Sequence, residues 1–108
     1  MNELKAKATL NDFQEYVSKL EKERGFENQT VIEKCLLLGE EVGELFKAVR
    51  KINNLAVDEN SDFTSVEEEL ADILIFLCSI ANRYDINLEE AFREKEKINR
   101  DRVWRPLK

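Results

Sequence analysis

The sequence of 108 residues contains no histidine, three glycines and one proline. The missing histidines exclude Ser-His-Asp triads, histidine general bases and imidazole metal ligands. The few glycines and the single proline leave no Gly-rich phosphate-binding loop and too few turn residues for an all-β fold. The sequence therefore predicts helices joined by few turns, in a single domain that spans residues 1–108.

Long apolar runs and cysteine pairs are also missing. The two cysteines, Cys35 and Cys78, lie in apolar stretches and outside any CxxC pair, so we expect both thiols to be buried and reduced. The N-terminal residues form no apolar signal segment, and the longest apolar run, Ile73–Cys78, is too short to span a membrane. These features predict a cytoplasmic protein with no membrane partner.

Charge is distributed unevenly along the chain, whose formal net charge is -6. Residues 93–108 hold seven basic and three acidic residues, a local charge of +4, so residues 1–92 carry -10. The overall charge argues against a nucleic-acid partner, because duplex affinity depends on basic residues that meet phosphates. The basic C-terminal segment has two interpretations: a solvated helix end that suits the helix dipole, or an anion-binding tail beside an acidic site.

Capping residues and apolar periodicity predict four helices. The predicted helices span residues 10–24, 31–52, 66–84 and 88–100, and their N-cap residues are Thr9, Thr30, Ser65 and Asn87. The connection Asn53–Thr64 is long for a helical bundle, which makes it a candidate functional loop.

The third predicted helix is apolar around nearly its whole circumference, so it should be buried on most sides. Four helices from a chain of this length cannot easily surround it, and a second subunit would supply the missing cover. The sequence thus predicts an all-α, four-helix, bundle-forming domain completed by homo-oligomerisation, as a dimer or a tetramer.

Two pairs of acidic residues interrupt the apolar faces of the second and third predicted helices. Glu41 and Glu44 are three residues apart, as are Glu69 and Asp72, and the pairs can face each other if the helices run antiparallel. At about 5 Å and an effective dielectric of about 20, each pair of carboxylates repels by about 3 kcal/mol. Desolvation adds several kcal/mol per ion.

A divalent cation relieves this repulsion most completely, and an all-oxygen ligand set selects Mg²⁺ or Mn²⁺ over zinc. Such a site indicates hydrolysis of a phosphate-containing substrate, because metal ions hold phosphate oxygens and lower the pKa of an attacking water. The alternative interpretation is that some of these acids are surface groups on misjudged helix faces.

The segments LGEEVGEL (residues 38–45) and ELAD (residues 69–72) resemble the ExxE and ExxD signature of MazG-like nucleotide pyrophosphohydrolases, the all-α NTP pyrophosphatases. The resemblance covers most of the chain and continues through DINLEEA (residues 85–91) and KINRDRVW (residues 97–104). It implies hydrolysis of nucleoside triphosphates between the α and β phosphates to a nucleoside monophosphate and pyrophosphate, in nucleotide-pool housecleaning.

The resemblance also implies roles for individual residues. The Mg²⁺ ligands would be Glu41, Glu44, Glu69 and Asp72. Glu40 is a candidate general base or outer acid of the metal site, and equally an exposed helix residue. The candidates for phosphate or nucleotide contacts, each with a structural or solvated role as the alternative, are Lys97, Asn99, Arg100 and Arg102.

Two other kinds of protein remain open at this point. One is a non-catalytic helical assembly module that retains a relic acidic metal-binding pocket, and the presence of all four acids weighs against it. The other is a carboxylate-rich regulator of a basic protein, which requires the acids to be exposed.

Overall fold

A computed structural model describes residues 2–58, 64–103 and 106, and this part of the chain folds into four α-helices without a strand. The helices are α1 (Leu10–Arg24), α2 (Val31–Ile52), α3 (Val66–Arg83) and α4 (Leu88–Arg100). The predicted all-α class is confirmed, and the predicted boundaries agree except that α3 ends one residue earlier. Residues 59–63 of the predicted functional loop lie outside the described residues.

Each helix begins where a side chain accepts a hydrogen bond from an amide of the first turn, because these amides have no partner within the helix. The bonds run to Thr9, Thr30, Ser65 and Asn87 from the amides of Asp12, Glu33, Glu68 and Glu90. At the start of α1 the Asp12 carboxylate also accepts from the Thr9 amide, which completes a capping box.

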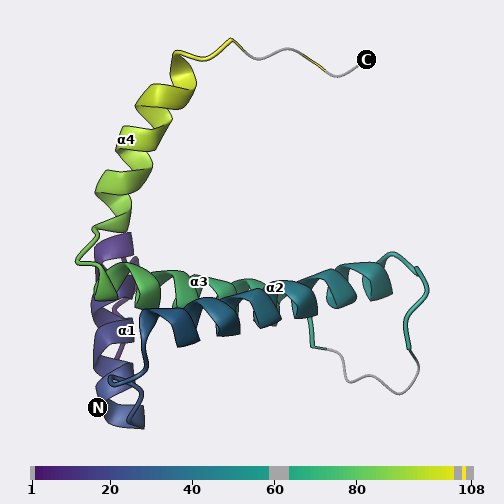
Figure 1. Cartoon of the computed structure of the whole chain (residues 1–108), viewed down its shortest axis with the longest axis horizontal. Coiled ribbons are helices and arrows are strands. Elements are labelled where there is room, and N and C mark those ends of the chain that lie inside the picture. Colours follow the sequence, from purple (N-terminus) through teal and green to yellow (C-terminus); the bar gives the residue numbers. More distant parts are fainter. Residues whose placement is uncertain (1, 59–63, 104–105, 107–108) are drawn as a thin grey trace.

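The helices α2 and α3 lie side by side and antiparallel, α1 crosses one end of this pair, and α4 projects away from it (Figure 1). The core lies between α1 and α3 and is centred on Val17, Leu20 and Cys78. Cys78 is buried as predicted. The prediction was wrong for Cys35, which is exposed because it lies about 120° around α2 from Glu41, on a side turned away from α3.

Apolar side chains remain exposed along α2, α3 and α4. On α3 these are Leu70 and Leu77, so the predicted burial of α3 on most sides holds only where α1 and α2 pack on it. An added subunit would cover such surface, and homo-oligomerisation stays a prediction. Among the described residues, no helix combines the length and the apolar character that crossing a membrane requires.

Gly25 ends α1 in the left-handed region, with φ 76°, and its amide donates to the carbonyls of Glu21 and Lys22. A Cβ at this position would meet nothing within 4 Å, so only backbone strain opposes a larger residue. We expect Gly25→Ala to lower the free energy of unfolding by about 1 kcal/mol in urea denaturation. The exposed substitution Glu23→Ala on the same helix should change it by less than about 0.5 kcal/mol. Equal stability of the two variants would contradict strain at Gly25.

Candidate metal centre

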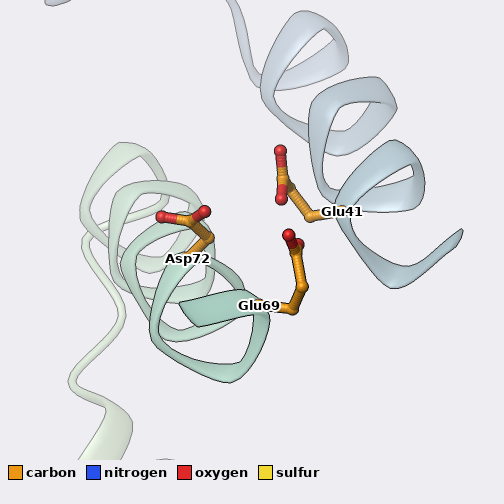
Figure 2. Close-up of side chains that lie close together, drawn as sticks. All are labelled: Glu41, Glu69 and Asp72. Atoms are coloured by element: carbon orange, nitrogen blue, oxygen red, sulfur yellow. The ribbon is translucent and has the colours of Figure 1, made fainter. Parts of the chain in front are cut away.

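Three carboxylates converge between α2 and α3. Glu41, Glu69 and Asp72 each offer one oxygen, and these oxygens all lie within 4.8 Å of one another. Glu41 comes from α2, and the other two come from successive turns of α3, where residues three apart share a side of the helix. Figure 2 shows the three side chains turned toward one another. Three of the four acids therefore meet as predicted. We call Glu41, Glu69 and Asp72 the acidic cluster.

The acidic cluster has a buried end and an open end. Glu69 is only 3% exposed, Glu41 is half-buried and Asp72 is exposed. Asp72 was predicted to interrupt the apolar face of its helix, but it is exposed because it lies about 60° around α3 from Glu69, at the edge of the contact with α2. A ligand can thus reach the cluster from solvent on the Asp72 side.

Glu69 carries an unsatisfied oxygen. Its Oε1 accepts a hydrogen bond from the hydroxyl of Thr64, just before the start of α3. Its Oε2 is buried, and no donor group in the described part of the chain contacts it. A buried carboxylate oxygen without a donor destabilises the fold, and a cation would supply the missing interaction.

The pKa of Glu41 is raised to about 7. The main cause is a side-chain hydrogen bond with Glu69, which favours the protonated form of Glu41. Burial adds to the shift, as do the negative charges of Glu69, Asp72 and Glu40. At neutral pH the Glu41 carboxyl is therefore near its pKa, in the place where a cation would put its positive charge.

These residues fit a hard divalent cation. The cluster offers only carboxylate oxygens, the ligand type that Mg²⁺ and Mn²⁺ prefer. Its crowded negative charge and the unpartnered Oε2 of Glu69 are both relieved by such an ion. The structure therefore supports a metal site at this position.

Glu44 and Glu40 lie outside the acidic cluster. Glu44 pairs instead with Lys47, with 3.4 Å between Oε1 and Nζ, and it lies about 60° around α2 from Glu41. Its role as a metal ligand stays a prediction. Glu40 is exposed beside Glu41, whose pKa its charge helps to raise, and its role as a general base also stays a prediction.

The predicted substrate-binding residues are not brought to the acidic cluster within one chain. They lie on α4 or just after it, and Figure 1 shows α4 turned away from the pair of α2 and α3. Leu88 packs against the core, whereas α4 contains no buried residue. Lys97 pairs with Glu94 at 3.2 Å, and the Asn99 amide donates to Glu96 at 3.4 Å. The four predicted substrate-binding residues are Lys97, Asn99, Arg100 and Arg102.

A buried charged network, which the sequence analysis missed, joins α1, α2 and α3. Glu21 accepts hydrogen bonds from Arg83 at 3.0 and 2.8 Å and from the Ser79 hydroxyl at 3.1 Å. The ammonium of Lys34 lies 3.5 Å from the Glu21 carboxylate and over the ring of Phe26. Burial opposes ionisation of Glu21 most strongly, yet the hydrogen bonds and the positive charges together lower its pKa.

One sequence signal pointed to this network. Lys34 lies on the same face of α2 as Leu37 and Glu41, which are three and seven residues further on. This spacing puts the positive charge of Lys34 in the contact with α3. A buried lysine needs an anionic partner. The partner itself, Glu21, has no signal in the spacing.

Comparison with known proteins agrees with this geometry. Residues 26–103 match the family model of the MazG nucleotide pyrophosphohydrolase domain. Two crystal structures of iMazG from Vibrio DAT 722 share the fold, each with 30% sequence identity. For the C-tagged form the TM-score is 0.64, with 86% of this chain and 99% of that chain covered. For the N-tagged form it is 0.65, with 91% and 100% covered.

Among curated proteins, none matches this sequence. The family model nevertheless spans most of the chain, and the likeness to iMazG extends over nearly the whole of both proteins. The ExxE and ExxD segments that carry the resemblance are the ones that build the acidic cluster. The chain therefore belongs to the MazG nucleotide pyrophosphohydrolase family.

Proposed function

We propose that this protein hydrolyses a nucleoside triphosphate between the α and β phosphates and releases a nucleoside monophosphate and pyrophosphate. The reaction depends on Mg²⁺, which Mn²⁺ can replace. The single observation that carries this proposal is the acidic cluster, whose buried and mutually repelling carboxylates call for a cation. Family membership supports nucleotide pyrophosphohydrolase activity in general.

In this proposal the residues of the chain hold the cation and receive a proton. Glu41, Glu69 and Asp72 would hold the ion, and Glu44, which pairs with Lys47 on the same helix, would be a fourth ligand. The bound ion supplies charge neutralisation at phosphate oxygens and lowers the pKa of a water molecule. Glu40, exposed beside the cluster, would accept a proton from the attacking water. Catalysis then rests mainly on alignment and electrostatic stabilisation.

We also infer a homo-oligomer, a dimer or a tetramer, in which the basic end of α4 meets the acidic cluster of another copy. The opposite charges of residues 93–108 and of the preceding chain support this arrangement, as does the direction of α4 away from the pair of α2 and α3 (Figure 1). The residues that would contact phosphates there are Lys97, Asn99, Arg100 and Arg102. We place this single domain, residues 1–108, in cytoplasmic nucleotide-pool housecleaning, with neither a nucleic-acid nor a membrane partner.

The test is pyrophosphate release from a panel of nucleotides with Mg²⁺ or Mn²⁺. We expect pyrophosphate without free phosphate, strict dependence on the metal, and a loss of about 100-fold in Glu41→Gln and Asp72→Asn. Free phosphate alone would indicate another phosphohydrolase. The absence of any product from folded, metal-supplied protein would favour the assembly module with a relic acidic pocket.

A further inference from the structure

Thr64 connects the start of α3 with the acidic cluster. It is the last residue of the connection Asn53–Thr64, the candidate functional loop, and it directly precedes Ser65, the N-cap of α3. Its hydroxyl donates a hydrogen bond to Oε1 of Glu69, the most buried member of the cluster. The end of this connection therefore contacts a residue that we place in the metal centre.

The geometry of a helix start explains why these two side chains meet. The residue before an N-cap lies next to the fourth residue of the helix, and in many helices two apolar side chains pack there. In α3 these positions hold Thr64 and Glu69, so a hydrogen bond replaces the apolar contact. The cap itself is a separate interaction, in which the Ser65 hydroxyl accepts from the amide of Glu68. The Thr64 hydroxyl thus has a partner outside the cap.

The hydrogen bond gives the two carboxylate oxygens of Glu69 different surroundings. Oε1 accepts from Thr64, whereas Oε2 is buried and has no donor among the residues that the structure describes. Figure 2 shows the Glu69 side chain turned toward Glu41 and Asp72. A glutamate side chain has several rotatable bonds, and a hydrogen bond to one oxygen limits the positions that the other can take. Thr64 thus holds Glu69 with one oxygen available to a cation.

The chemical nature of the donor also favours a metal ligand. Glu21, which belongs to the buried charged network, is paired with the guanidinium of Arg83 at 2.8 Å. A cationic partner of this kind neutralises the carboxylate and would repel a metal ion. The Thr64 hydroxyl carries no charge, so it orients Glu69 and leaves the negative charge to attract a cation.

We propose that Thr64 is a positioning residue of the metal centre, whose hydroxyl orients Glu69 so that Oε2 is available to the bound cation. The proposal rests on the proposed function for the presence of the ion. It goes beyond the proposed ligand set, because Thr64 acts through Glu69 and contacts neither the ion nor the nucleotide. Its consequence is a change in affinity for the ion, which can be measured without a nucleotide.

Mn²⁺ binding, followed by electron paramagnetic resonance of the free ion, tests this role. We expect Thr64→Val, which removes the hydroxyl, to weaken Mn²⁺ binding by about 10-fold with unchanged far-UV circular dichroism. Thr64→Ala also lacks the hydroxyl and should show the same loss, so the test does not depend on the folding of the valine variant. Thr64→Ser keeps a hydroxyl and should bind Mn²⁺ as the native protein does.

The control is Ser65→Ala, which removes the N-cap of α3 at the adjacent position and leaves the Thr64 hydroxyl in place. It should lower the urea midpoint of unfolding without changing the Mn²⁺ affinity of the folded protein. Native-like affinity in Thr64→Val and Thr64→Ala would overturn the proposal. An equal loss of affinity in Thr64→Ser or Ser65→Ala would also overturn it, because the hydroxyl would then not be the cause.

Pyrophosphate release separates this proposal from the proposed function. With saturating Mn²⁺, Thr64→Val should recover most of the native rate, because the hydroxyl acts on ion binding. A rate that stays low would overturn the assigned role. If Mn²⁺ binding depends on Thr64 but the native protein releases no pyrophosphate, the proposed function is wrong and the positioning role stands. If the native protein binds no Mn²⁺, both are wrong.

Discussion

Glu69→Gln is expected to reduce metal-dependent pyrophosphate release by about 1000-fold and to stabilise the metal-free protein. The loss of activity follows from the geometry of the acidic cluster. Glu69 is its most buried carboxylate, and its oxygen lies within 4.8 Å of oxygens from Glu41 and Asp72. A neutral amide at this position binds a divalent cation far more weakly than a carboxylate does.

The gain in stability has a separate cause. In the metal-free protein the buried Oε2 of Glu69 has no donor in the described part of the chain, and its charge repels Glu41 and Asp72. Glutamine removes the charge and brings an amide donor close to Glu41. We expect the free energy of unfolding in the presence of a chelator to rise by about 1 to 2 kcal/mol.

Saturating Mg²⁺ should reverse the order of stability, because only the native protein gains the binding energy of the ion. The matched control is Glu67→Gln, an exposed acid on the same turn of α3, which should change stability by less than about 0.5 kcal/mol and leave activity intact. A Glu69→Gln variant with native activity would contradict the proposal that Glu69 binds the metal ion. A variant that is destabilised both with and without Mg²⁺ would contradict it as well.

The helix boundaries and most of the acidic cluster were predictable because their causes are local. A residue such as Thr30 caps the helix that follows it, and this chemistry involves only the next three residues. Likewise, the rotation of about 100° per residue put Glu41 among apolar residues and kept Glu69 beside Asp72. The remaining condition, antiparallel packing of α2 and α3, is common for helices adjacent in sequence.

What could not be predicted depends on side-chain competition and on distant parts of the chain. Spacing allowed Glu44 into the cluster, but Lys47 one turn away binds it. The direction of α4 depends on the turn after α3, where Asp85 has a positive φ of 54°. The pairing of Glu21 with Arg83 joins residues 62 positions apart and has no local pattern.

Arg83→Ala is expected to lower the free energy of unfolding by about 3 to 5 kcal/mol, the largest stability effect anticipated for a single substitution in this chain. The guanidinium donates to both carboxylate oxygens of Glu21 and to the carbonyls of Phe26 and Gln29 in the connection between α1 and α2. Alanine leaves Glu21 buried and charged with weaker compensation, and it removes the donors to both carbonyls.

Two comparisons test whether the stability lost in Arg83→Ala comes from the buried charge of Glu21. Arg93→Ala breaks an exposed pair with Glu89, 3.1 Å long, and should cost less than about 1 kcal/mol. Adding Glu21→Gln to Arg83→Ala should restore part of the lost stability, because the uncompensated buried charge is then gone. A double variant that is less stable than the sum of the two single changes would contradict this account of the network.

The stability difference between native protein and Arg83→Ala should depend on pH, and this dependence identifies its source. The folded protein holds the pKa of Glu21 below its ordinary value of 4.5, so the ionised form contributes stability above about pH 4.5. This contribution is lost as the pH falls through the lowered value, where Glu21 takes up a proton in the folded state. The difference in unfolding free energy between native protein and Arg83→Ala should therefore be constant near neutral pH and shrink in acid. If the difference persists unchanged in acid, the stability comes from the contacts of Arg83 with the carbonyls of Phe26 and Gln29 rather than from Glu21.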